Sequence, residues 1–179
     1  MKKFFNKKLK RIGILGGTFD PPHYGHLFIS KVALKKLKLN KLIWVITKKN
    51  PLKKKPFLSL DTRIKLSKKI IIKEKKIFIK FLEKKVKSNN TYNLLNYIKK
   101  RNLNTKIYFL IGADNLLTLH KWNNWKKISN IAKIVVFSRN NYLKKSYNSV
   151  AAKKLNKKDW MYIKCKTVNI SSSLIRKFW

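Results

Sequence analysis

Short apolar runs alternate with longer segments whose apolar residues recur at helical spacing. The runs predicted as strands are residues 11–15, 42–47, 77–82, 106–111, 133–138 and, less regularly, 161–168. The segments predicted as helices are residues 27–39, 61–72, 91–100 and 122–131, with Asp61 as a possible N-cap and a last helix opening at 170–173. This alternation predicts an α/β fold: a single doubly wound, Rossmann-like domain over residues 1–179, with a mainly parallel sheet flanked by helices. Ligands are expected at the carboxyl ends of its strands, near the switch point.

Composition agrees with a folded, cytoplasmic protein. The chain has 179 residues and 44% hydrophobic residues, enough for a buried core. No apolar run approaches the roughly 20 residues of a membrane span. Residues 1–11 are basic, but the apolar stretch after them is too short for a signal peptide. A single cysteine, Cys165, cannot form an internal disulfide, which suits a reducing compartment.

The formal net charge of +40 comes from 46 Lys and Arg against six acidic residues. Such a charge ordinarily indicates a nucleic-acid-binding protein. The lysines, however, run from end to end, and Asn and Ile are abundant where Gly and Pro are scarce, as an AT-biased genome would produce. We therefore favour a polyanionic small-molecule substrate and no specific nucleic acid, with a dedicated nucleic-acid-binding protein kept as the alternative.

Rare residues gather in one window near the N-terminus. Residues 13–26 hold four of the five glycines, two of the three histidines, two of the four prolines and Asp20. The window lies between a predicted strand and a predicted helix, where Gly16 and Gly17 permit a positive-φ turn and a close approach of backbone N–H groups to a phosphate. It matches neither the P-loop nor the dinucleotide G-x-G-x-x-G pattern.

His23 and His26 stand three residues apart at the start of the predicted helix, so both rings lie on one face beside the positive end of the helix dipole. That arrangement suits the charge that develops on the phosphates of a nucleoside triphosphate as pyrophosphate leaves. A tight turn with two structural histidines is the plainer interpretation, and the clustering argues against it.

Three further groups are candidates, each with a plain structural alternative. Three serines, Ser171 to Ser173, open a predicted helix and offer donors to an anion, with Arg176 about one turn in as a fixed cation, although serines also cap helices. Asp114 follows a predicted strand and suits ribose hydroxyls or a Mg²⁺-bound phosphate, or it caps a helix. Trp122 and Trp125 suit stacking on an aromatic ligand or packing in the core. No cluster of cysteine, histidine and carboxylate has metal-cage spacing, so no protein metal site is expected.

The motifs resemble one enzyme family. Gly16-Gly-Thr-Phe-Asp-Pro-Pro-His-Tyr-Gly-His-Leu27 is similar to the signature of bacterial nicotinate-nucleotide adenylyltransferase, with the H-x-G-H element of the nucleotidyltransferase superfamily. The segments Asn50-Pro-Leu-Lys53, Ile111-Gly-Ala-Asp-Asn-Leu116, His120-Lys-Trp-Asn-Asn-Trp125 and Ser171-Ser-Ser-Leu-Ile-Arg176 also resemble family motifs. One stretch departs: the family usually shows Tyr-Thr-x-Asp-Thr-Leu, and this chain reads Asn90-Thr-Tyr-Asn-Leu-Leu95.

The resemblance implies transfer of the adenylyl group of ATP, with Mg²⁺, to nicotinate mononucleotide. His23, His26 and Arg176 would be catalytic. The residues implied to bind ATP are Gly16, Gly17, Thr18, Phe19, Asp114, Ser171 and Ser172. The residues implied on the acceptor side are Thr91, Tyr92, Trp122, Arg139 and Lys53, with Trp122 stacking on the nicotinate ring. Nicotinamide mononucleotide and phosphopantetheine remain alternative acceptors.

Overall fold

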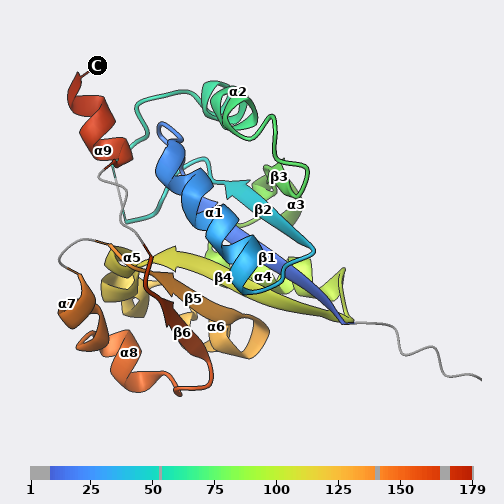
Figure 1. Cartoon of the computed structure of the whole chain (residues 1–179), viewed down its shortest axis with the longest axis vertical. Helices are drawn as coiled ribbons and strands as arrows, with labels where there is room; N and C mark the ends of the chain where they lie inside the picture. Colours follow the sequence, from blue (N-terminus) through green and yellow to red (C-terminus); the bar gives the residue numbers. More distant parts are fainter. Residues whose placement is uncertain (1–8, 53, 140–141, 166–169, 179) are drawn as a thin grey trace, which may run out of the picture.

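The computed structural model describes residues 9–52, 54–139, 142–165 and 170–178. Six strands form one sheet in the order β3-β2-β1-β4-β5-β6, and every neighbouring pair is parallel (Figure 1). The strands are β1 Lys10–Gly17, β2 Lys41–Ile46, β3 Ile77–Lys80, β4 Thr105–Gly112, β5 Lys133–Phe137 and β6 Trp160–Ile163. The predicted α/β, Rossmann-like fold is therefore confirmed, with a sheet that is wholly parallel.

The order of the strands creates a switch point in the middle of the sheet. β1 pairs with β2 on one side and with β4 on the other, so the chain adds strands outward in one direction and then in the other. The connections after β1 and β4 leave the sheet on opposite faces, and a crevice opens at their carboxyl ends.

Helices cover both faces of the sheet. The α-helices are α1 Tyr24–Lys36, α2 Leu60–Ile70, α3 Glu83–Val86, α4 Thr91–Lys100, α5 Ala113–Thr118, α6 Trp125–Ile131, α7 Leu143–Tyr147, α8 Val150–Lys154 and α9 Ser172–Ile175. Two 3₁₀ turns, η1 Leu119–Lys121 and η2 Arg176–Phe178, extend α5 and α9. One buried cluster joins α1 and α2 to the sheet, and a second joins α4, α5, α6 and α8 to its other face. Among the described residues, no helix is long and apolar enough to cross a membrane.

Several predicted boundaries were wrong for physical reasons. Ser59, not Asp61, caps α2, because its hydroxyl accepts from the N–H of Thr62 at 3.1 Å. α1 begins three residues earlier than predicted because His23 caps it. β6 ends at Ile163, so the predicted strand is wrong at Lys164 and Cys165, and its remainder, residues 166–168, lies outside the described residues. The helices α3, α5, α7 and α8 were not predicted, since four to six residues are too few for a periodic pattern.

Candidate functional site

A large hollow opens at the carboxyl ends of β1, β4 and β5. It has a volume of about 1130 Å³. The predicted residues that line it are Gly16, Gly17, Thr18, Phe19, His23, His26, Asp114, Trp122, Arg139, Ser171, Ser172 and Arg176. Segments from both ends of the chain and from its middle thus meet at one place, as expected for the switch point of a doubly wound sheet.

A smaller hollow of about 340 Å³ adjoins the first. The two share Gly16, Gly17, Asn50 and Trp122 in their walls. Two neighbouring hollows with a common wall suit two substrates that react with each other.

The two histidines are fixed by the backbone that they cap. Nδ1 of His23 accepts from the N–H of Gly25 at 3.1 Å, and Nδ1 of His26 accepts from the N–H of His23 at 3.2 Å. Together they form a reciprocal capping box at the start of α1. Because each Nδ1 is an acceptor, each neutral ring carries its proton on Nε2. Both imidazoles are therefore donors, and both line the large hollow.

The His23 ring is held neutral. Burial and, as the smaller cause, the positive charge of Arg139 lower its pKa from 6.5 to about 4. At neutral pH this ring therefore offers an N–H donor without a positive charge of its own.

Gly25 is needed because of His23. A Cβ atom built on Gly25 would lie 2.9 Å from Cε1 and Nδ1 of the His23 ring. That is closer than real Cβ atoms come to other atoms, so a side chain here would displace the ring. The small residue inside H-x-G-H thus leaves room for the first imidazole.

In the turn after β1, the residue with a positive φ is not one of the predicted glycines. No described glycine has a positive φ; the left-handed residue is Phe19, with φ 49°. Phe19 is 2% exposed and stacks on Trp44, with ring centroids 4.9 Å apart. Its ring also lies 4.8 Å from that of His26. The strained conformation of Phe19 is thus held by aromatic packing beneath the second histidine.

Asp114 lies in the first turn of α5 and does not cap it, because the N-cap is Gly112. Its Oδ2 accepts from Nη1 of Arg139 at 2.6 Å. Its Oδ1 is buried and has no hydrogen-bond partner among the described residues. A buried carboxylate oxygen without a donor is costly, and the hydroxyl of a bound ligand would supply one.

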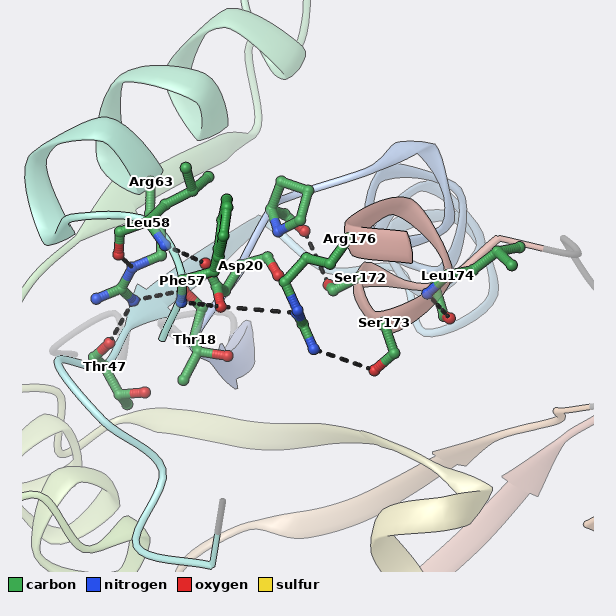
Figure 2. Close-up of polar contacts among 12 residues, drawn as sticks. Thr18, Asp20, Thr47, Phe57, Leu58, Arg63, Ser172, Ser173, Leu174 and Arg176 are labelled. Carbon is green, nitrogen blue, oxygen red and sulfur yellow. Dashed lines mark hydrogen bonds and ion pairs between the residues drawn. The ribbon is translucent and has the colours of Figure 1, made fainter. Parts of the chain in front are cut away.

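Polar contacts join the last helix, α9, and the turn after it to the loop after β1 (Figure 2). Ser171 caps α9, as its hydroxyl accepts from the N–H of Leu174 at 3.1 Å. Ser172 donates to the carbonyl of Pro21 at 2.8 Å. Arg176 donates to the carbonyl of Asp20 and lies 3.6 Å from its carboxylate. Residues 150 positions apart in sequence thus form one wall of the large hollow.

The predicted acceptor residues divide between the two hollows. Thr91 and Trp122 line the smaller one, while Tyr92 packs partly buried against the core and lines neither. Arg139 lines only the large hollow, beside Asp114 and within electrostatic reach of His23. Lys53 lies outside the described residues.

Some lining residues were missed by the sequence reasoning. Lys54 and Lys55 line the large hollow, but no local pattern distinguishes them in a chain with 46 basic residues. Asp20 was noticed only as a rare residue; its carboxylate accepts from the N–H groups of Phe57 and Leu58 at 2.8 and 2.9 Å. Its position inside the glycine-rich window was the available signal.

The described residues contain no group of three or more His, Cys, Asp or Glu side chains that could hold a metal ion.

Residues 14–178 match the cytidylyltransferase-like family. A probable nicotinate-nucleotide adenylyltransferase of Pelagibacter ubique (strain HTCC1062) is 51% identical over 172 residues, 96% of this chain and 95% of that protein. One of Clostridium tetani (strain Massachusetts / E88) is 35% identical over 94% of this chain and 86% of that protein. A solved structure, Plasmodium falciparum nicotinic acid mononucleotide adenylyltransferase complexed with NaAD, superposes with a TM-score of 0.74 at 26% identity, over 94% of this chain and 83% of that one.

Proposed function

Because the chain belongs to the nicotinate-nucleotide adenylyltransferase family, we propose that it transfers the adenylyl group of ATP to nicotinate mononucleotide, giving deamido-NAD and pyrophosphate. The observation that carries the proposal is the pair of imidazoles whose Nδ1 atoms accept hydrogen bonds from the backbone at the start of α1. Similar proteins bind the corresponding ligands: one P. falciparum structure holds NaAD and another holds APC.

In this proposal the reaction is one in-line displacement. A phosphate oxygen of the mononucleotide attacks the α-phosphorus of ATP, and the bond from that phosphorus to the oxygen bridging the β-phosphate breaks. Pyrophosphate leaves with the electron pair of that bond. A phosphate monoester is already a nucleophile at neutral pH, so the reaction requires no general base and no covalent enzyme intermediate. Catalysis then rests on alignment and on stabilisation of charge.

The residues of the large hollow suit the triphosphate. We assign His23 and His26 as N–H donors to its phosphates, with His26 stabilising the transition state. Arg176, with Ser171 and Ser172 on the same helix, would face the β- and γ-phosphates, since α9 is fastened beside the histidine loop. Gly16, Gly17, Thr18 and Phe19 would supply the backbone on which the nucleotide rests. Mg²⁺ bound to the ATP phosphates would neutralise part of their charge.

Asp114 is proposed to bind a ribose. Its Oδ1 atom, which has no donor among the described residues, suits a ribose hydroxyl, and the contact with Arg139 holds the other oxygen in place. A ribose hydroxyl would therefore complete the hydrogen bonding of this carboxylate.

The smaller hollow suits the nicotinate ring. Trp122 stands between the two hollows, where its indole can stack on an aromatic ring. Thr91 is the first residue of α4, and a ten-residue helix presents N–H groups and the positive end of its dipole to an anion there. This end of α4 therefore favours the carboxylate of nicotinate over the neutral amide of nicotinamide mononucleotide. Two residues here differ from the usual family stretch: the N–H of Asn93 donates to Asn90, and Leu94 adds an apolar surface to the wall of the smaller hollow.

Replacing the second histidine tests the proposal. His26→Ala removes one phosphate donor, and we expect turnover to fall about 10²-fold or more, as for the loss of one preorganised donor. Formation of deamido-NAD from ATP, Mg²⁺ and nicotinate mononucleotide is followed by mass spectrometry. His120→Ala is the control, since His120 lines neither hollow and should retain the wild-type rate. A His26→Ala enzyme with a near-wild-type rate would contradict the assignment.

A further inference from the structure

Arg63, on the first turns of α2, is a buried guanidinium bound entirely to backbone. Its side chain is 1% exposed. Nη1 donates to the carbonyls of Thr18 and Thr47 at 2.6 and 2.7 Å, and Nε donates to that of Leu58 at 3.2 Å (Figure 2). Nη2 donates to the carbonyl of Lys48 at 3.1 Å. One side chain therefore joins three segments: the loop after β1, the end of β2 and the entry to α2.

These contacts meet at the two ends of one loop, residues 48–58. The carbonyls of Lys48 and Leu58 both accept from Arg63. The N–H groups of the same two residues are held by carboxylates: that of Lys48 donates to Glu83 and that of Leu58 to Asp20. At each end of the loop, both the N–H and the carbonyl of one residue are therefore held by hydrogen bonds. Two of the six acidic residues of the chain serve this purpose.

The loop fixed in this way contributes to both hollows and, through Asn50, to their common wall. Asn50 lines both, Leu52 lines the smaller one, and Lys54 to Phe57 line the larger one. A shift of the ends of the loop would therefore move the walls of both hollows at once, and with them the relative positions of two bound substrates.

Stability alone does not account for this residue. Burial lowers the pKa of Arg63, with Asp20 and Glu83 opposing the shift, so keeping the guanidinium charged inside the protein carries a cost. An apolar side chain would avoid that cost, but it would leave four carbonyls near the substrate hollows without their donor.

We propose that Arg63 is a positioning residue for both substrates: by closing the base of loop 48–58, it sets the common wall between the triphosphate hollow and the mononucleotide hollow. The inference rests on the proposed function for its two substrates. Arg63 itself lines neither hollow and touches no reacting group.

The test compares Arg63→Met and Arg63→Lys with Ile71→Ala, a core substitution directly after the same helix. Ile71 is 9% exposed and lies at the far end of α2, so its truncation destabilises the protein without touching the loop. We expect Arg63→Met to raise the KM for nicotinate mononucleotide and for ATP about tenfold or more, because small misplacements of substrates are costly. Ile71→Ala should lower the melting temperature and leave both KM values within about twofold.

Hydrogen exchange gives a readout that does not depend on activity. The amides of Lys48, Phe57 and Leu58, which donate to Glu83 and Asp20, should exchange about tenfold faster in Arg63→Met, and those of α4 should not change. Arg63→Lys keeps the positive charge but has fewer hydrogen-bond donors, so its KM values and loop exchange rates should lie between those of wild type and Arg63→Met. If Arg63→Met does not fold, the results for Arg63→Lys decide.

Unchanged KM values, or loop exchange no faster than in Ile71→Ala, would overturn the inference. If the wild-type enzyme proves inactive with nicotinate mononucleotide, the proposed function fails, and the exchange of the loop amides still decides whether Arg63 positions the loop.

Discussion

His23 acts both as the N-cap of α1 and as a proposed donor to phosphate. The cap requires Nδ1 to accept from Gly25, and this same contact places the proton on Nε2. Burial and Arg139 then keep the ring neutral at physiological pH. A neutral donor can bind a phosphate oxygen without a proton being taken up or released, so donation from His23 should persist across neutral pH.

This environment predicts the titration of His23. Nuclear magnetic resonance of the imidazole carbons should give a pKa of about 4, with the signal assigned by comparison with a His23→Asn variant. Arg139→Met should raise that pKa, because it removes a positive charge near the ring. The unfolded protein takes up a proton near pH 6.5 and the folded protein only near 4, so His23 lowers the free energy of unfolding as pH falls between these values. A pKa near 6.5 in the folded protein would contradict the described burial.

Residues such as Arg63 and Asp20 show what local sequence could not predict. Arg63 is one of 46 basic residues, and nothing near it in sequence marks it as buried. Its partners are carbonyls at positions 18, 47, 48 and 58, and such contacts depend on the packed fold. The two histidines could be identified as candidate site residues because they belong to one short motif, H-x-G-H.

At the scale of elements, the start of α1 depends on three residues, two histidines and one glycine. His23 and His26 cap the helix, and Gly25 leaves space for the first ring. Function and local stability are therefore in conflict at Gly25, since alanine is the better helix former by about 1 kcal/mol.

This conflict predicts an unusual phenotype for Gly25→Ala. The new Cβ displaces the His23 ring, so turnover should fall about tenfold or more through misplacement of a donor. The melting temperature should change little, because the better helix propensity of alanine offsets the loss of the cap that the displaced ring made. Gly13→Ala gives the matched contrast, because its Cβ meets the tip of the Leu39 side chain in the core at 2.7 Å, outside both hollows. That variant should lose stability and retain its rate. Gly25→Ala with wild-type turnover would contradict the described geometry.

The elements that sequence predicted best are the buried strands and α4, whose predicted and observed bounds coincide at Thr91–Lys100. Their apolar patterns are long and regular. The short helices α3, α5, α7 and α8 carry no such pattern and form because the packed sheet positions them. Ser172 illustrates the same limit: its bond to Pro21 joins the two ends of the chain, and no local motif specifies it.

At the scale of the whole molecule, the order β3-β2-β1-β4-β5-β6 brings the two ends of the chain and its middle to one crevice. Alternating strands and helices predicted a doubly wound sheet with ligands at the carboxyl ends of its strands, because parallel strands and crossover helices leave few topologies. The order of the strands was not predicted. The separation of the crevice into two hollows was not predicted, since it depends on the path of loop 48–58.

The net charge of +40 is also a property of the whole molecule. Such a field attracts ATP and mononucleotides, and it would attract nucleic acid as well, so charge alone does not select between the two functions. The arrangement of the site residues distinguishes the two functions. A nucleic-acid-binding role would not require the histidine cap, the Asp114–Arg139 contact and a second hollow to converge at the switch point.

The measurement that tests the central claim most directly is pyrophosphate release from ATP and Mg²⁺ with three acceptors offered in parallel: nicotinate mononucleotide, nicotinamide mononucleotide and phosphopantetheine. The account predicts release that depends on the nicotinate compound and exceeds that with the amide about tenfold or more, because a carboxylate at the start of α4 gains a charge-assisted contact that an amide lacks. Release with none of the three, or a preference for phosphopantetheine, would contradict it.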